Sequence, residues 1–397
     1  MVTNKEQNKL NVPHLRFPEF HGEWEEHGLS EYLDFKNGLN PDSKRFGKGI
    51  KFISVMDILN NPVITYDCIR ASVQATDAEM SSFSVENGDI LFQRSSETLE
   101  DVGRANVYID DKVAVFGGFV IRGKKKANYN PLFFRYLLSS PYARKRIIPM
   151  GAGAQHFNIG QEGLSKVLLN FPSIEEQTKI ASLLHLLDER IATQSKLIEK
   201  LESLIKGIVD CTILRKEKNA IVGDVCSISE QIRAEANIDD IITVRLHGNG
   251  VCKSSAENLQ LGATQYYRRR AGQLIYGKQN FHNGAIGIVP ISLDNGITSK
   301  DIPSFDIDEM KCNSVYLLAQ LQSPQYYKPA EALTTGTGSK RLKEETFLKM
   351  PIVLPNKSEQ DNISVLIHRA SMNLDHAKRL LELLSIQKQF LLRQMFI

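Results

Sequence analysis

Apolar residues recur at alternating steps of four and three between Ile180 and Ile208, which is the a/d spacing of a coiled-coil helix. The spacing returns between Ile363 and Leu391, at an offset of 183 residues. Sixteen of the eighteen positions are apolar, and Gln194 and Lys388 are the exceptions. The apolar positions are Ile180, Leu184, Leu187, Ile191, Ile198, Leu201, Ile205, Ile208, Ile363, Ile367, Ala370, Leu374, Ala377, Leu381, Leu384 and Leu391. The pattern predicts two long helices that pack on each other along one seam.

A strict seven-residue repeat drifts against the 3.6 residues of a helical turn, so we expect the two helices to supercoil left-handedly. At about 1.5–3 kcal/mol per large buried side chain, the seam would clamp them strongly. The alternative is that each helix only covers the core of its own domain. We favour pairing because nine consecutive positions share one register.

Short apolar runs ahead of the first helix predict strands. The runs at 50–56, 89–92 and 113–121 are partly β-branched and bounded by Gly, Asn or Asp. A helix is expected over 131–139, ending before Pro141, and a strand over 167–171. Ser173 is a plausible N-cap for the long helix, with Glu175 and Glu176 favourable in its first turn. This order predicts a mixed α/β domain.

The second half of the chain repeats this order. Scaffold positions return at offsets of 183 or 184, while the sequence between them differs. The repeated positions are Gly88-Asp89 and Gly272-Gln273, Ser140-Pro141 and Ser323-Pro324, Pro172 with Gln177 and Pro355 with Gln360, and the glycine loops at 150–159 and 335–342. We infer a duplicated domain-plus-helix unit with two diverged domains. If the helices pair antiparallel, the two copies are related by a pseudo-two-fold axis.

Length and composition fit a globular protein of two or three domains, with 397 residues, 42% hydrophobic and 24% charged. No apolar run approaches the roughly 20 residues that span a bilayer, and the polar N-terminus does not read as a signal peptide. We therefore expect a cytoplasmic protein without a membrane partner. A net charge of +3 permits a nucleic-acid partner without requiring one.

Residues for metal binding or catalysis do not fall into recognisable patterns. The five cysteines include no C-x-x-C pair, and the nine histidines show no ligand spacing, so no metal is expected. Residues 272–278 match part of a P-loop, but Gln279 follows where a Ser or Thr is required. Residues 130–133, Asn-Pro-Leu-Phe, lack the second proline of an adenine methyltransferase site and are better explained as a helix start. We predict no catalytic residue.

Polar and basic residues on loops are the remaining candidates. Arg and Lys suit phosphates and guanine, and Asn and Gln suit adenine. The glycine loops and the ends of the two equivalent strands are favoured because they recur in both halves. The candidate DNA-binding residues are Gln93, Arg94, Ser95, Ser96, Gln155, His156, Asn158, Lys278, Gln279, Asn280, Lys340 and Arg341. The basic clusters at 122–126, 144–146 and 268–270 are also candidates, against the alternative of a solvated surface.

The predicted helices also suggest a spacer. About 29 residues at 1.5 Å each give a rod of roughly 43 Å. Dyad-related modules on duplex DNA read half-sites about 34–36 Å apart. Because the two domains differ in sequence, the two half-sites should differ too.

Taken together, the chain resembles the specificity subunit of type I restriction-modification systems over nearly its whole length. The similarity rests on residues 13–20 with Gly22 and Trp24, on the strand motif at 88–91, and on the helix starts at 172–177 and 355–360. Their order and their duplication make the match specific.

The resemblance implies a non-catalytic subunit that binds a bipartite, asymmetric site on double-stranded DNA. It implies two α/β target-recognition domains, separated by a long antiparallel two-helix coiled coil. It also implies two modification subunits that bind S-adenosylmethionine and methylate adenine N6, and two restriction subunits that use ATP and Mg²⁺, so that this chain binds no cofactor itself. The expected parts are a disordered segment 1–12, domains 13–172 and 215–355, and spacer helices 173–214 and 356–397.

Two other functions stay open at this point. A coiled-coil scaffold could carry two divergent domains that bind ligands or proteins, which the low net charge favours. An enzyme with its own nuclease or methyltransferase centre is disfavoured, because a catalytic domain of about 150–250 residues would have to lie within the repeats.

Overall fold

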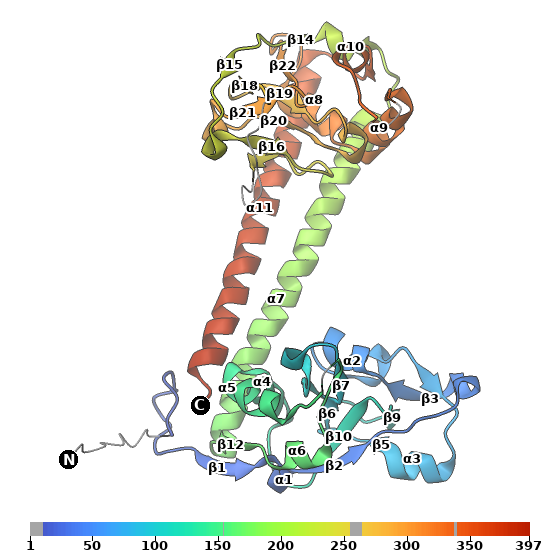
Figure 1. Cartoon of the computed structure of the whole chain (residues 1–397), viewed down its shortest axis with the longest axis vertical. Helices are drawn as coiled ribbons and strands as arrows, with labels where there is room; N and C mark the ends of the chain where they lie inside the picture. The colour runs from blue at the N-terminus through green and yellow to red at the C-terminus, as the bar shows by residue number, and fades with distance from the viewer. Residues whose placement is uncertain (1–10, 154, 255–263, 337–339) are drawn as a thin grey trace, which may run out of the picture. The chain divides into compact units, whose positions relative to one another are not determined.

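The computed structural model describes residues 11–153, 155–254, 264–336 and 340–397. The segment set apart at 1–12 therefore lies outside the described residues, except for Asn11 and Val12. The chain divides into two compact units. Unit 1 comprises Met1–Gln194 with Leu380–Ile397, and unit 2 comprises Ser195–Arg379. Each unit thus holds one globular part and a portion of both long helices, α7 (Ile174–Val209) and α11 (Lys357–Gln394) (Figure 1).

Unit 1 is built on two four-stranded sheets. The first has the order β2-β10-β6-β8 and is antiparallel throughout; the second has the order β4-β3-β9-β5, with β3 and β9 parallel. The strands are β1 (Glu25–Gly28), β2 (Leu33–Asn37), β3 (Phe46–Ile53), β4 (Ser72–Val73), β5 (Ser84–Val85), β6 (Ile90–Gln93), β7 (Ser95–Ser96), β8 (Ala105–Val107), β9 (Ala114–Phe116), β10 (Val120–Lys125), β11 (Phe157–Asn158) and β12 (Leu168–Phe171). The helices are α1 (Leu29–Tyr32), α2 (Val55–Asn60), α3 (Asp77–Phe83), α4 (Pro131–Ser139), α5 (Pro141–Ile147) and α6 (Gln161–Ser165).

Two of the predicted strands were wrong in extent. The run 50–56 leaves β3 at Ile53, because the Asp57 carboxylate accepts from the amide and hydroxyl of Ser54 and caps α2 instead. The run 113–121 is two strands, β9 and β10, since a turn closes between them where the Val120 amide donates to the Gly117 carbonyl at 2.8 Å. The helix predicted over 131–139 is confirmed as α4.

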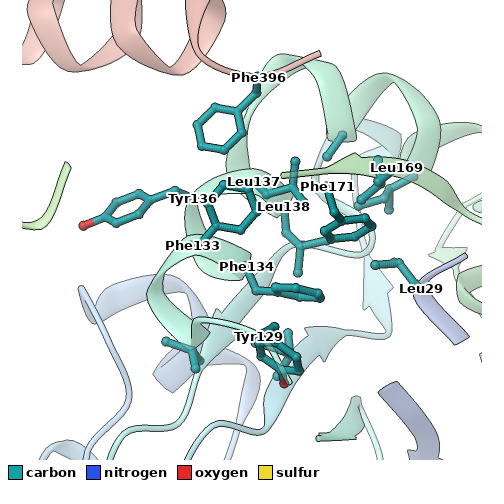
Figure 2. Close-up of a cluster of buried hydrophobic side chains, with 14 of the residues drawn as sticks. Leu29, Tyr129, Phe133, Phe134, Tyr136, Leu137, Leu138, Leu169, Phe171 and Phe396 are labelled. Carbon is teal, nitrogen blue, oxygen red and sulfur yellow. The ribbon is translucent and has the colours of Figure 1, made fainter. Parts of the chain in front are cut away.

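The core of unit 1 is aromatic and includes the end of α11. Figure 2 shows Phe134 of α4 between Tyr129 and Phe171, with Phe396 over Phe133 of the same helix. The Phe133 and Phe396 rings lie 5.6 Å apart, and Phe134 stacks on Phe171 at 5.2 Å. Such ring pairs add stabilisation beyond the area they bury. The core of the first globular part is therefore completed by residues from the other end of the chain.

Unit 2 repeats the first sheet of unit 1. Its antiparallel sheet has the order β14-β22-β19-β20. A separate three-stranded sheet has the order β15-β18-β21. The strands are β13 (Ala220–Ile221), β14 (Cys226–Ile228), β15 (Arg233–Ala234), β16 (Ile242–Val244), β17 (Val251–Lys253), β18 (Tyr266–Arg268), β19 (Leu274–Tyr276), β20 (Ile286–Ile288), β21 (Ile297–Ser299), β22 (Ser304–Ile307) and β23 (Pro351–Ile352). The helices are α8 (Ser314–Leu321), α9 (Pro324–Tyr327) and α10 (Glu344–Leu348).

The repeated Gln at the start of each long helix makes the same contacts in both units. Gln177 accepts from the Asn130 amide at 3.1 Å and donates to the Pro172 carbonyl at 3.0 Å. Gln360 accepts from the Asn313 amide at 2.9 Å and donates to the Pro355 carbonyl at 2.8 Å. Asn130 and Asn313 each cap a helix as well. The repeated residues therefore dock a long helix in the same way in both units.

The N-terminal segment at 13–24 joins both long helices in unit 1. The Arg16 guanidinium makes two bonds, 2.8 and 2.7 Å, to the carboxylate of Glu176 in the first turn of α7. The Glu176 side chain is 2% exposed, so this bidentate pair is shielded from solvent. The Leu15 amide donates to the carbonyl of Gln394, at the end of α11.

The seam residues face inward in both units. Each of the eighteen a and d positions is buried or half-buried, whereas the helix positions between them are largely exposed. In unit 1 the core includes Leu184, Leu187, Leu384 and Leu391. In unit 2 it includes Val209 of α7 with Ile363 and Ile367 of α11. Within each unit the two helices are therefore packed antiparallel through apolar side chains.

Lys388, the charged interruption of the seam, meets an acid on the opposite helix. Its Nζ lies 2.5 Å from Asp188, whose carboxylate also accepts from Arg135 at 3.2 Å and from the Tyr136 hydroxyl at 2.9 Å. The Lys388 and Asp188 side chains are only 25% and 15% exposed. Burial raises the pKa of the Tyr136 hydroxyl, so it remains a neutral donor to this carboxylate. A charge cluster of this kind fixes the register of a coiled coil.

Replacing Asp188 by Leu should lower the midpoint of thermal unfolding, because Lys388 and Arg135 lose a charge-assisted partner worth about 1.5–3 kcal/mol. Adding Lys388→Met should recover part of the loss, because the double variant no longer has a Lys388 ammonium group without an acidic partner. The control is Glu189→Gln, a 61% exposed acid on the same helix. Scanning fluorimetry measures all three, and an Asp188 variant as stable as the control would contradict the assignment.

Candidate nucleic-acid interface

Three segments of unit 1 meet where β6 ends. The Arg94 amide donates to the Phe119 carbonyl at 2.9 Å, and the Ile159 amide donates to the Arg94 carbonyl at 2.9 Å. The two residues that follow Arg94 form β7, which pairs antiparallel with β11. One backbone residue therefore joins the turn before β10 to the glycine loop.

The glycine loop is a tight hairpin. Ala152 and Asn158 exchange backbone bonds of 2.9 and 2.8 Å across it. Gly153 has φ +147, and a Cβ there would lie 2.0 Å from the His156 carbonyl oxygen. Only glycine fits this close backbone approach. The Asn158 side chain accepts from the Ser95 hydroxyl, which ties the hairpin to β7.

Unit 2 has the same backbone arrangement. The Lys278 amide donates to the Asp301 carbonyl at 2.9 Å, and the Leu342 amide donates to the Lys278 carbonyl at 2.9 Å. Thr335 and Arg341 exchange backbone bonds of 3.0 and 2.9 Å, as Ala152 and Asn158 do in unit 1. The two units thus present different side chains on the same backbone arrangement, which we call the loop frame. It consists of a strand end, a turn and a hairpin: Arg94, Phe119 and 152–158 in unit 1, and Lys278, Asp301 and 335–341 in unit 2.

The acids and cations of the loop frame differ between the units. In unit 2, Lys278 pairs with Glu344 at 2.7 Å, Lys340 with Glu331 at 3.4 Å and Arg341 with Asp301 at 3.3 Å. Lys278, Arg341 and Glu344 also line a surface pocket of about 540 Å³. In unit 1 the Arg94 guanidinium donates to the Gly118 carbonyl at 3.3 Å. The second loop frame therefore combines donors with carboxylate acceptors.

The loop frames bring together most of the residues chosen from the sequence, but the side chains differ in their exposure to solvent. Gln155, His156, Asn158, Gln279, Asn280, Lys340 and Arg341 are exposed, and Arg94, Ser95 and Ser96 are half-buried. Gln93 is 5% exposed, and its amide donates to the Ser95 carbonyl at 2.9 Å. The Lys278 side chain is 12% exposed against Glu344. Gln93 therefore holds the backbone of Ser95, and Lys278 is directed to Glu344, so neither side chain reaches outward.

Sequence reasoning missed Phe119 and Asp301, which occupy equivalent turn positions in the two loop frames. The apolar run 113–121 predicts a single strand, and that prediction places Phe119 inside a sheet rather than in a turn. The adjacent Gly117-Gly118 pair was the signal for a turn.

The three basic clusters are partly internal. Arg144 donates to the carbonyls of Gly103 and Val102, and its burial lowers its pKa to about 10. Arg269 is fully buried and donates to Thr298 and Ser304; burial likewise lowers its pKa to about 10. Arg122 is 6% exposed, and its pKa is also lowered by burial. These arginines hold the fold together, so a cationic sequence cluster is not by itself a binding surface.

The described ranges contain no group of three or more His, Cys, Asp or Glu side chains that could hold a metal ion. In the same ranges, no helix combines the length and apolarity needed to cross a membrane.

Comparison with known proteins assigns the first half of the chain. The family of the type I restriction modification DNA specificity domain matches residues 21–203. The resemblance inferred from the sequence is thereby confirmed, and the match takes in the first specificity domain together with most of α7.

Relatives of the specificity domain agree with this assignment. The MjaX specificity subunit of a type I restriction enzyme from Methanocaldococcus jannaschii is 24% identical over 210 residues, which are 52% of this chain and 48% of that protein. The match thus spans about half the length of the curated relative.

Solved structures extend the likeness to the whole fold. The type I restriction-modification S subunit from M. genitalium covers 97% of this chain and 99% of its own, with a TM-score of 0.63 and 13% identity. A chain from a structure on complex assembly and conformational transition of the type I R-M system covers 93% of this chain and 96% of its own, with a TM-score of 0.51 and 13% identity. The expected fold class is confirmed: two mixed α/β domains and an antiparallel two-helix coiled coil.

Replacing Gly153 by Ala should loosen the first hairpin, since a strained backbone of this kind costs about 1–3 kcal/mol. The expected result is faster hydrogen exchange, by roughly 5- to 150-fold, at the Asn158 and Ile159 amides. Gly160→Ala is the matched control, because a Cβ at Gly160 meets nothing within 4 Å. Equal exchange in both variants would show that the hairpin does not depend on Gly153.

Proposed function

We propose that the chain is the DNA sequence-recognition subunit of a type I restriction-modification complex. It binds a bipartite, asymmetric site on double-stranded DNA and directs partner subunits to methylate adenine N6 or to cleave. The chain itself carries out no chemistry and binds no cofactor. S-adenosylmethionine belongs to the modification subunits, and ATP and Mg²⁺ belong to the restriction subunits. Its DNA substrate makes the cytoplasm its place of action.

The observation that carries this proposal is the repeated loop frame. Four backbone hydrogen bonds recur between the units at 2.8–3.0 Å, yet the exposed side chains around them are unrelated. A binding scaffold that is kept while its contact residues change is suited to reading two different short sequences. The two loop frames therefore correspond to the two unlike halves of the DNA site.

The side chains of each frame match the chemistry of base edges and phosphates. Exposed amides such as Gln155, Asn158 and Asn280 can pair with adenine, and Arg341 can pair with guanine. Asp301, beside Arg341, can accept from the amino group of cytosine. Contacts of Lys340 and Arg341 to phosphates would release counterions from the DNA and make the affinity of unit 2 dependent on salt.

The long helices carry a second set of apolar residues on their outer side. In unit 1 these are Leu183 and Leu186 of α7 and Leu380, Leu383, Ile386 and Phe390 of α11, which are 36–64% exposed. In unit 2 they are Leu197 and Leu204 of α7 and Val365, Leu366 and Met372 of α11, which are 45–52% exposed. Apolar surface on a helix pair whose seam is already filled is a protein contact surface. Its presence in both units supports docking of two modification subunits, one to each unit; two restriction subunits then join that assembly.

The other functions considered from the sequence are weaker. A ligand-binding scaffold accounts for the coiled coil, but the similarities to specificity proteins do not favour it. An enzymatic function would require a catalytic domain, and both units are taken up by the repeated scaffold.

Deletion of the gene should remove one asymmetric N6-methyladenine motif from the host genome, with the partner methyltransferase genes left intact. The motif should consist of two short half-sites around a fixed gap. Single-molecule sequencing measures this directly, and reintroducing the gene is the control. An unchanged methylome from a strain in which the complex is expressed would contradict the function.

Substitutions in one loop frame should affect one half-site. Arg94→Ala should weaken preference in the half read by unit 1, and Lys340→Ala in the half read by unit 2, each by about 5- to 150-fold for a contact of 1–3 kcal/mol. Lys166→Ala removes a 66% exposed lysine outside the loop frame and should have little effect. Competition binding with duplexes altered in either half measures this, and equal loss at both halves would argue against independent reading.

Exchanging residues 14–170 for those of a relative tests the same division by domain. Methylome sequencing should show one half-site changed and the other kept. A change in both halves would contradict independent domains.

A further inference from the structure

One aromatic side chain of the first loop frame is left outside the core. Phe119 is 68% exposed, whereas its neighbours Phe116 and Val120 are fully buried. Unit 1 has an extensive aromatic core. The exposure of this ring is therefore not explained by a lack of apolar side chains in the unit. Exposing a phenylalanine to this extent forgoes roughly 1.5–3 kcal/mol of burial. The ring is therefore available for contact with a partner.

The backbone under Phe119 is held on every side. The Val120 amide closes the turn on the Gly117 carbonyl at 2.8 Å, and the Gly117 amide donates to Ile53 at 3.0 Å. A Cβ added to Gly117 would lie 2.7 Å from the Phe52 ring, and one added to Gly118 would lie 1.8 Å from the side chain of Asn40. Because there is no space for the turn to move, the ring is presented on a rigid base. Pre-organisation of this kind reduces the entropy cost of binding.

The neighbours of Phe119 belong to the proposed DNA surface. Its carbonyl accepts from the Arg94 amide at 2.9 Å, and Arg94 is joined in turn to Ile159 and the hairpin. Polar groups on Ser95 and Asn158 lie next along the frame. Phe119 therefore belongs to the same loop frame as a guanidinium and hydrogen-bonding groups of the type that read base edges in the major groove. The only apolar group that a base pair displays there is the thymine methyl.

Unit 2 shows that this turn position varies with the domain. Asp301 takes the place of Phe119, since its carbonyl accepts from the Lys278 amide at the same 2.9 Å. Its carboxylate pairs with Arg341 at 3.3 Å. An apolar ring in one frame and an acid in the other, on an unchanged backbone, is the behaviour of a residue that selects a base rather than one that supports the fold.

We propose that Phe119 is a specificity-determining residue that selects a T·A pair in the half-site of unit 1 by contact with the thymine 5-methyl group. The proposal rests on the proposed function, because it assumes that the loop frame contacts DNA. It assigns the contrasting role to Asp301, which cannot favour a methyl group. Phe119 adds no catalytic function.

The test uses the full chain assembled with its modification subunits and duplexes that carry the methylated motif. Each thymine of the unit 1 half-site is replaced in turn by uracil, which removes only the methyl group. Dissociation constants are measured for the wild type, Phe119→Ala, Phe119→Leu and the control Met56→Ala, which truncates another exposed apolar side chain of unit 1 (61% exposed).

We expect one uracil to weaken wild-type binding about fourfold, the value of one buried carbon group. That uracil should have no effect on Phe119→Ala, whose affinity for the unmodified motif should already be reduced at least fourfold. Phe119→Leu should retain part of the uracil effect, and Met56→Ala should match the wild type. This non-additive pattern is the evidence of direct contact.

Three results would overturn the assignment while leaving the proposed function intact. These are uracil effects that are the same with and without Phe119, a half-site that contains no thymine in either strand, and loss of modification subunits from the Phe119→Ala complex, which would make the ring a protein contact. A ring that wedges between base pairs would show uracil-independent binding with increased fluorescence of a neighbouring 2-aminopurine, and it would also overturn the assignment. A wild-type complex without preference for the motif would overturn the proposed function itself.

Discussion

The packing of apolar a and d side chains between α7 and α11 is the constraint on which both units depend. Each unit packs one portion of each helix into or against its core, through Leu184 and Leu384 in unit 1 and through Ile208 and Ile363 in unit 2. The Lys388–Asp188 contact adds a charged pair that has one register in which it is satisfied. Slippage by a heptad would separate Lys388 from Asp188 and leave the lysine without this acid.

The loop frame separates support from recognition. Backbone amides and carbonyls make the contacts that set its shape, so the side chains at the same positions are free to differ. Gln93 illustrates the supporting part, because it is buried and holds the backbone of Ser95. Gln155 and His156 illustrate the exposed part. A domain of this design can change its exposed side chains without changing how it folds.

The sequence was informative where structure follows from a local repeat. The heptad spacing predicted both long helices, and the offset of 183 predicted the duplicated helix starts at Gln177 and Gln360. Contacts between distant residues left no such signal. Nothing in the pattern around Arg144 or Arg269 shows that backbone carbonyls and hydroxyls fill the role of counter-ions there. Phe119 was missed for a different reason: the Gly117-Gly118 pair marks a turn, but the rest of the run 113–121 is apolar and resembles one strand.

The place of Phe396 in the core of unit 1 has a consequence for synthesis of the protein. Trp24 and Phe133 lie 6.4 and 5.6 Å from its ring, yet they leave the ribosome more than 260 residues earlier. During most of translation, the aromatic surface of the first globular part is therefore uncovered. The second globular part, in contrast, can form from contiguous residues. A chain that stops early would keep this surface open and become a target for chaperones and proteases.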